Sequence, residues 1–527
     1  MPYRDLREWI AQLDKAGELK RVRVEVDPDL EMAEIADRAA KMNGGNGGPA
    51  LLFENVKGHP GARVLMNQFG SMRKMQMALE CTSLDRVAGR LETLLKPQVP
   101  TGLMDKLKML PMLAEVGSFF PKVIDRKLAS CKEVIDTGSS IDLGELPILK
   151  TWPGDADRFI TLPLVITRDP NSGKRNMGMY RMQVYDERTT GMHWQRQKNA
   201  AEHLRDRLRA TASTDADRVK LMAMTSGGTT AANNTETLGD VTLSKIRGTR
   251  MDVAVAIGAD PALTFSAIVP APPEIEEFLI AGFLRGKPVE LVKAETVDLE
   301  VPAHAEYILE GYVDLAELRS EGPFGDHTGF YTMPEDYPVF HLTAITHRKN
   351  PVYAATVVGK PPMEDAWLAK AVERIFLPLI KLTMPEIVDI NLPPEGVAHN
   401  LMLISIRKSY AGHARKVMSG IWALGQAMFT KCIVIVDEDC DVQDVGEVTL
   451  RVANNIDPER DIQFTLGPVD SLDHASRLPN FGSKMGIDAT RKWPAEGFTR
   501  PWPDMLEMPK DVKQRVDVLW SQLNLDR

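Results

Sequence analysis

The feature that most constrains the fold is a change of pattern along the chain. Residues 1–121 alternate amphipathic helix patterns with short strand patterns, and the same rhythm returns over residues 324–527. Between them, residues 122–323 carry many short β-type runs and few helices, which is typical of a barrel or a sandwich. The sequence therefore predicts an α+β protein of three domains with these boundaries.

Five segments carry definite secondary-structure predictions. Residues 162–170 and 176–186 read as two strands of a hairpin, with a Gly-containing turn between them. Residues 265–270, FSAIVP, read as a further strand, whereas residues 273–287 read as one amphipathic helix. The chain ends in a further helix pattern, PKDVKQRVDVLWSQLNL.

Composition excludes several classes of function. The net charge is −9 and no run of Lys or Arg stands out, so no nucleic-acid partner is expected. No uncharged apolar run is long enough to span a bilayer, and the N-terminus, MPYRDLREWI, has no apolar signal core. The four cysteines form no CxxC pair and read as free thiols in a reducing cytoplasm. A cytoplasmic location is predicted, with peripheral contact to a membrane left open.

Residues 321–328, EGPFGDHT, place two acids around a tight bend. Gly and Pro explain the bend, but they do not explain Glu321 and Asp326. Either both acids face water, or they present two carboxylates to one cleft. Arg181 lies in a predicted strand between apolar neighbours, so it must face solvent or be paired.

Three further groups have a structural and a functional interpretation. Asn176 and Arg181 are five residues apart and would point to opposite faces of a strand, unless Gly178 makes a bulge. Acids at 274, 276 and 277 complement the dipole of the helix that they begin. Lys431 is either a surface lysine or a cation that holds a phosphate.

Together, these motifs resemble the UbiD family of decarboxylases, in particular its 3-polyprenyl-4-hydroxybenzoate carboxy-lyase branch. The resemblance runs from DLREWI to about Trp493 and rests on long motifs in the expected order. They are NMGMYRMQVYDERTTGMHW, the helix with Glu277, KAETVDLEVPAHAE, ILEGY, EGPFGDHTG, YAGHARKVM, FTKCIVIVDED and GSKMGIDATRKWP. The resemblance implies a split β-barrel flavin-binding domain, flanked by an N-terminal and a C-terminal α/β domain.

The same resemblance implies the chemistry. The family reversibly decarboxylates aromatic or α,β-unsaturated acids with prenylated flavin mononucleotide (prenylated FMN); this branch acts on 4-hydroxybenzoate derivatives. It implies Arg181, Glu321 and Asp326 as catalytic residues, with Glu321 as proton donor. We expected one of the two acids to be charged and the other protonated.

The implied cofactor site includes a divalent cation, Mn²⁺ or Mg²⁺, with K⁺ nearby. The metal ligands that match are Asn176 and Glu277, and Gln197 stands where the family has histidine. His193 and His203 are nearby substitutes. The full set of expected cofactor-binding residues is Asn176, Met179, Arg181, Arg196, Gln197, Glu277 and Lys431.

Two departures from the family pattern keep other interpretations open. Gln197 offers a neutral carbonyl oxygen that binds a transition metal more weakly than histidine does. Residues from about 211 to 250 form an apparent insertion. The alternatives are a non-catalytic or assembly subunit with impaired cofactor binding and, with less support, a flavin-dependent oxidoreductase.

The expected partners are a small-molecule carboxylic acid, a flavin prenyltransferase that supplies the cofactor, and further copies of the chain. A homodimer or homohexamer is implied, with the last helix reaching a neighbour.

Overall fold

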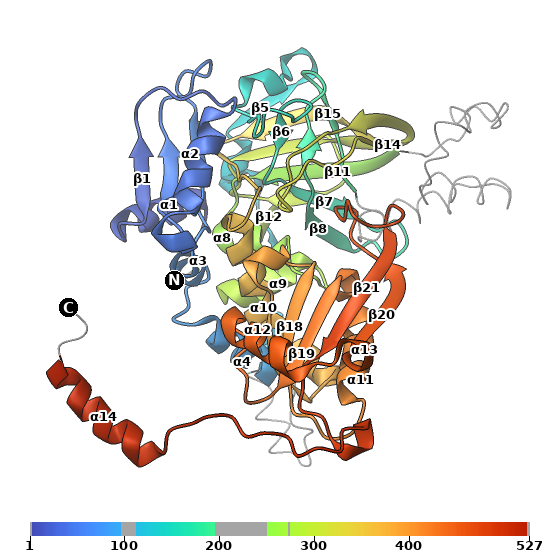
Figure 1. Cartoon of the computed structure of the whole chain (residues 1–527). Coiled ribbons are helices and arrows are strands. Elements are labelled where there is room, and N and C mark those ends of the chain that lie inside the picture. Colours follow the sequence, from blue (N-terminus) through green and yellow to red (C-terminus); the bar gives the residue numbers. More distant parts are fainter. Residues whose placement is uncertain (1–2, 96–111, 195–249, 272–274, 524–527) are drawn as a thin grey trace, which may run out of the picture.

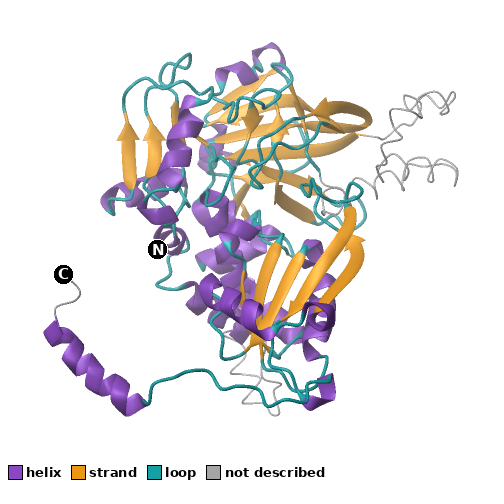
Figure 2. Cartoon of the chain, viewed as in Figure 1, coloured by secondary structure: helices purple, strands orange, loops and turns teal. Residues whose placement is uncertain are grey.

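A computed structural model describes residues 3–95, 112–194, 250–271 and 275–523 of the chain. Helices and strands are mixed throughout, which confirms the mixed helix and sheet content of the predicted class (Figures 1 and 2). Arg196, Gln197, His203 and most of the insertion lie outside the described residues. Among the described residues, no helix is both long and apolar enough to cross a bilayer.

The N-terminal part is a four-stranded sheet with helices against it (Figure 1). Its first helix begins after Asp5, whose side chain accepts a hydrogen bond from the amide of Glu8, and buries Leu6, Trp9 and Leu13 along one face. The elements are α1 (Leu6–Lys15), β1 (Leu19–Val22), α2 (Glu31–Ala40), β2 (Ala50–Phe53), β3 (Arg63–Met66), α3 (Met72–Ala78) and α4 (Leu84–Leu95).

The central part contains a seven-stranded sheet in the order β10-β15-β14-β11-β7-β8, with β5 on β15. The strands of this sheet are β5 (Val134–Thr137), β7 (Leu164–Arg168), β8 (Arg175–Met179), β10 (Thr189–Gly191), β11 (Arg250–Ile257), β14 (Tyr307–Glu321) and β15 (Glu335–His347). The smaller sheets and the helices around it are β4 (Lys122–Val123), β6 (Phe159–Ile160), β9 (Met182–Gln183), β12 (Glu290–Lys293), β13 (Glu300–Pro302), α8 (Pro261–Ser266) and α9 (Glu277–Arg285).

The predicted hairpin is present, because β7 and β8 pair antiparallel across the expected turn. The strand predicted at FSAIVP is wrong. Its first two residues, Phe265 and Ser266, are the last two residues of helix α8. This helix begins at Pro261, directly after its N-cap residue Asp260. Strands β10 and β8 are the two ends of the strand order, so a closed barrel would need them to pair. Among the described strands no such pairing occurs, and the split barrel therefore stays a prediction.

The expected domain boundary at residue 323 falls inside the central sheet. Strand β14 ends at Glu321 and pairs with β15 all the way to Glu335, so the acid turn begins the connection between two long neighbouring strands. Strand β16 (Val352–Ala354) then pairs with β3 of the N-terminal sheet. Sequence periodicity marks a strand but not its partner, and the division into three domains stays a prediction.

Residues 364–488 form what we call the C-terminal lobe, a five-stranded sheet in the order β17-β18-β19-β21-β20. Its elements are α10 (Glu364–Thr383), β17 (Ile387–Asn391), β18 (Leu401–Ile406), α11 (His413–Trp422), β19 (Cys432–Asp437), α12 (Val445–Asn455), α13 (Pro458–Asp461), β20 (Ile462–Pro468) and β21 (Phe481–Asp488). Parallel strands β18 and β19 flank α11, as the expected β-α-β rhythm requires.

The last helix, α14 (Lys510–Leu523), stands apart from the rest at the end of an extended segment (Figure 1). The helix itself was expected. Its packing against a neighbouring subunit stays a prediction.

Candidate active site

The acid turn is fixed by contacts on both sides of the bend. The amide of Gly322 donates to Gln183 Oε1 over 2.8 Å, and the amide of Gly325 donates to Asp155 Oδ1 over 2.7 Å. Gly322 has φ +95°, and a Cβ on Gly325 would lie 2.2 Å from Trp152 Cδ1. Both glycines are therefore required by the shape of the turn.

Arg181 lies between the two acids. Its Nε donates to Glu321 Oε1 over 2.9 Å, and its Nη1 donates to Asp326 Oδ2. Its Nη2 contacts Thr332 Oγ1 at 3.2 Å, while the guanidinium lies 4.5 Å from the ring centre of Phe324. The structure thus brings the three predicted catalytic residues together, with both carboxylates on one cation.

The sequence predicts Arg181 inside a strand, but the structure places it between strands β8 and β9. The β7–β8 register runs regularly from Arg175 to Met179, so Gly178 makes no bulge. The strand ends instead, and the ring of Tyr180 fills the space where a Gly178 side chain would be, 2.4 Å from an added Cβ.

Both acids are held ionised. Burial raises the pKa of Glu321, but His193 and Arg181 outweigh burial and leave the pKa below its usual value. Burial also raises the pKa of Asp326, but His327 and Arg181 outweigh burial and bring the pKa of that carboxyl well below its usual range. The expectation of one charged and one protonated acid is therefore wrong for the unliganded site, because each acid has two cationic or imidazole partners.

Two histidines complete this site, and the sequence interpretation missed their roles. His193 Nδ1 lies 3.1 Å from Glu321 Oε1, and its ring is 4.2 Å from that of Tyr337. His193 was considered only as a substitute metal ligand, but the structure places it against the acid. His327 Nδ1 lies 2.8 Å from Asp326 Oδ1. Its position directly after Asp326 was the one signal available in the sequence.

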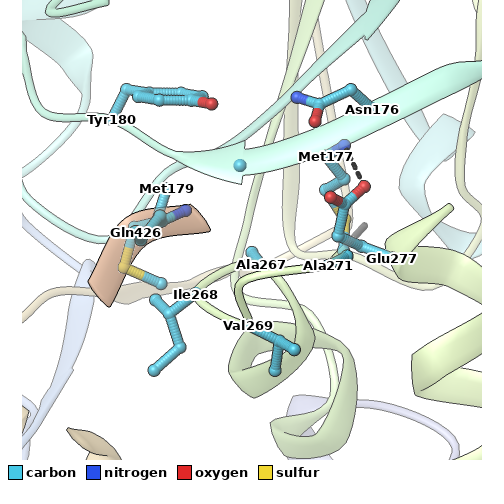
Figure 3. Close-up of a pocket in the computed structure, with 11 residues that line it drawn as sticks. Asn176, Met177, Met179, Tyr180, Ala267, Ile268, Val269, Ala271, Glu277 and Gln426 are labelled. Atoms are coloured by element: carbon cyan, nitrogen blue, oxygen red, sulfur yellow. Dashed lines mark hydrogen bonds between the residues drawn. The ribbon is translucent and has the colours of Figure 1, made fainter. Parts of the chain in front are cut away.

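A second cluster surrounds a cavity of about 90 Å³ (Figure 3). Strand β8, the segment after α8 and the start of α9 supply most of its walls, and the C-terminal lobe adds Gln426, which the sequence interpretation missed. The lining residues are Asn176, Met177, Gly178, Met179, Tyr180, Ala267, Ile268, Val269, Ala271, Glu277 and Gln426. Three expected cofactor-binding residues, Asn176, Met179 and Glu277, therefore line one cavity.

Glu277 is the first residue of α9, and Glu276 is its N-cap residue. The helix therefore begins later than the acid cluster suggested, and residue 274 is outside the described part. Glu276 pairs with Arg175 at 2.9 Å, whereas Glu277 accepts the amide of Met177 over 2.8 Å. Burial raises the pKa of Glu277 to about 7. Among the described residues, no cation pairs with it.

The residues present around this cavity fit a phosphate group with a divalent cation. Asn176 Nδ2 is buried and has no partner among the described residues. A side-chain amide offers a donor to a phosphate oxygen and an acceptor to a cation, and a carboxylate is a ligand that Mg²⁺ and Mn²⁺ prefer.

Lys431 lies just before β19, and its Nζ contacts Asp473 Oδ1 at 2.8 Å. It does not line the cavity, so its contact with a phosphate stays a prediction. No group of three or more His, Cys, Asp or Glu side chains that could hold a metal occurs among the described residues. The expected third ligand, Gln197, lies outside them.

Comparisons with known proteins give a consistent result along the chain. Models of the 3-octaprenyl-4-hydroxybenzoate carboxy-lyase match in three pieces: the N-terminal domain at residues 10–92, the Rift-related domain at 122–361, and the C-terminal domain at 366–489. A protein of Archaeoglobus fulgidus is 50% identical over 99% of both chains.

Two solved structures are similar over nearly the whole chain. Vanillic acid decarboxylase of Sedimentibacter hydroxybenzoicus in closed form has 26% identity and a TM-score of 0.80, covering 99% of this chain and 100% of its own. Its open form gives a TM-score of 0.72. The UbiD-class enzyme HmfF of Pelotomaculum thermopropionicum, in complex with FMN, has 29% identity and a TM-score of 0.73, covering 97% and 99%. The chain therefore belongs to the UbiD family.

Proposed function

We propose that this protein is a reversible, non-oxidative decarboxylase of an aromatic or α,β-unsaturated carboxylic acid that uses prenylated FMN. A 4-hydroxybenzoate derivative is the first substrate class to test. The observation that carries the proposal is the buried contact of Arg181 with both Glu321 and Asp326. The similarity to vanillic acid decarboxylase and to HmfF, one form of which is described in complex with prFMN, supports it.

The cofactor would lie between the two clusters described above. Asn176, Glu277 and Gln197 would hold Mn²⁺ or Mg²⁺ at its phosphate, with K⁺ nearby, and Lys431 would hold the phosphate itself. Met179, Arg181 and Arg196 are the remaining proposed binding residues. Prenylated FMN, when bound, supplies the electron sink that carbon dioxide loss requires and that side chains lack.

The chain's own residues would bind, orient and move a proton. Arg181 is immobilised by two carboxylates, so its guanidinium holds one orientation in a site from which most water is excluded. Glu321 is 1% exposed and contacts Arg181, which suits a proton donor to the carbon that loses its carboxylate.

Glu321 must first take up a proton, because Arg181 and His193 keep it ionised in the unliganded protein. His193 Nδ1, at 3.1 Å, is the group through which that proton would reach the carboxylate. Asp326, held by Arg181 and His327, would stay ionised and fix the geometry.

As a whole, the chain is more similar to the closed form of vanillic acid decarboxylase, with a TM-score of 0.80, than to its open form, with a TM-score of 0.72. We infer that the closed arrangement is the one in which the acid turn is used. A homodimer or homohexamer and a cytoplasmic location remain part of the proposal.

The proposal is tested on protein co-expressed with a flavin prenyltransferase. Absorbance, mass spectrometry and metal analysis measure the cofactor, and 4-hydroxybenzoate derivatives and other aromatic or α,β-unsaturated acids are then screened for release of carbon dioxide. Stoichiometric prenylated FMN with turnover of one acid is expected. Flavin that is absent but restored by Gln197→His would locate the defect at the metal. Absence that this substitution does not restore would favour the assembly-subunit alternative.

A further inference from the structure

The loop that follows the acid turn reaches across to the C-terminal lobe. His327 Nε2 lies 2.9 Å from His399 Nε2, and the ring of Phe330 lies 4.4 Å from that of His474. His327 and Phe330 belong to the central part of the chain, whereas His399 and His474 belong to the lobe. A five-residue stretch that starts at Asp326 thus supplies both an acid of the proposed active site and two contacts to the lobe.

The imidazole of His327 is hydrogen-bonded at both nitrogens. A carboxylate can only accept, so Nδ1 of His327 donates its proton to Asp326 Oδ1 over 2.8 Å. At the other end, one proton must lie between the two Nε2 atoms. An imidazolium at position 327 donates at both ends, to Asp326 on one side and to a neutral His399 on the other.

The charges around the pair support this proton arrangement. Burial lowers the pKa of His327, but Asp326, together with Asp365 and Asp470, outweighs burial and raises the pKa to about 9. Burial and the neighbouring His327 lower the pKa of His399 to about 4, against the opposing charges of Asp470 and Asp326. The proton therefore stays on His327.

We propose that His327 is a positioning residue that couples docking of the C-terminal lobe, sensed at His399, to the placement of Asp326. With the lobe docked, His399 fixes the plane of the His327 ring, and the ring in turn fixes one oxygen of Asp326 while Arg181 holds the other. Without the lobe, the ring loses one acceptor and can rotate, so Asp326 loses an oriented donor. The relevance to catalysis rests on the proposed function, but the coupling itself does not.

The test uses the full chain without added substrate. Selective isotope labelling of the histidines reports their protonation by NMR, and small-angle X-ray scattering reports lobe docking. His399→Phe keeps a ring but cannot accept a hydrogen bond from His327, whereas the side-chain carbonyl introduced by His399→Gln can. His341→Gln is the matched control, since His341 pairs with Glu317 within the central sheet at 2.6 Å.

In His399→Phe we expect the pKa of His327 to fall by about one pH unit, because a bond to the charged form is lost. The radius of gyration should increase, and His399→Gln should restore both values. The control should match the wild type.

The proposal is overturned if His327 titrates alike in the wild type and in His399→Phe, or if the radius of gyration is the same in both. If His399→Phe does not fold, His399→Gln decides the question: it should keep the wild-type pKa of His327 and the wild-type scattering, and loss of both would overturn the proposal.

Activity separates this coupling from the proposed function. Once a substrate is known, His399→Phe should lower kcat about tenfold at little change in KM, an effect of the size that positioning residues have. His399→Gln should recover most of the loss. If no carboxylic acid is turned over by the wild type, the proposed function fails, while the NMR and scattering results still report on the coupling.

Discussion

The acid turn and the cavity beside α9 both contain buried carboxylates, but the pKa of these carboxylates is shifted in opposite directions. Glu321 and Asp326 share Arg181 and each has a histidine, and the pKa of both lies below its usual value. Glu277 receives a backbone amide and no cation among the described residues, and burial raises its pKa to about 7.

The difference shows which buried carboxylates are neutralised by side chains of the chain itself and which are left for a ligand to neutralise. A buried carboxylate without a counter-charge is costly, and proteins keep one where an outside group supplies that charge. The acid turn is complete without any ligand. The cavity at Glu277 also contains Asn176 Nδ2, which has no partner among the described residues, and a cation and a phosphate would complete this set of ligands.

The largest effect is expected at Glu321, the proposed proton donor. Glu321→Gln keeps the shape of the side chain but cannot deliver a proton in the same way, so activity should fall about 10²- to 10⁴-fold. Flavin content should be unchanged, because Glu321 does not line the cavity at Glu277. Glu335→Gln is the control, since Glu335 lies opposite Glu321 on β15. Equal losses in both variants would argue against a specific role for Glu321.

The second prediction removes the shared cation. Arg181→Met removes the cation that two buried carboxylates share and should lower the free energy of unfolding by about 3–5 kcal/mol at pH 8. Without Arg181, only His193 and His327 oppose the effect of burial, so the pKa of both acids rises and the loss should shrink as the pH falls towards 5. Urea unfolding at the two pH values measures this. A loss that does not depend on pH would mean that packing, and not charge, holds the turn.

The third prediction concerns the incomplete cluster. At a concentration one hundred times Kd, a ligand that binds only the folded chain stabilises it by about 2.7 kcal/mol. Glu277→Gln should abolish most of this gain for Mn²⁺ with FMN, and should leave the ligand-free chain as stable as the wild type or about 1 kcal/mol more stable. Thermal unfolding measures both quantities.

Glu276→Gln is the matched control for that experiment, because its carboxylate already pairs with Arg175. It should keep the ligand-induced gain. A large loss of ligand-free stability in Glu277→Gln would show that the fold, and not a ligand, uses the Glu277 charge.

The remaining prediction is a pH dependence at His327. Its pKa rises from 6.5 to about 9 in the folded chain. The stabilisation is therefore fully present below pH 6.5 and is lost as the pH rises through 9, by on the order of 3 kcal/mol. His327→Gln should remove this slope. Urea midpoints of the wild type and the variant, measured from pH 6 to pH 10, should converge at the high end; parallel curves would contradict the assignment.

The sequence by itself determined the local elements and the residues that carry chemistry. The β7–β8 hairpin follows from two alternating runs around a Gly-containing turn, and helices α10 and α11 follow from apolar spacing. The bend at residues 322–325 follows from its glycines and proline. The motif resemblance selected Arg181, Glu321 and Asp326, and the structure brings them into contact.

Only the tertiary structure decided which elements are neighbours. Strand β15 pairs with β14 across the expected boundary, and β16 pairs with a strand nearly three hundred residues earlier. The protonation of the acids also depended on distant partners, His193 and His327, which local pattern does not reveal. The physical reason is the same in both cases. Periodicity is a property of neighbouring residues, whereas pairing and pKa are sums over groups that only the folded chain brings together.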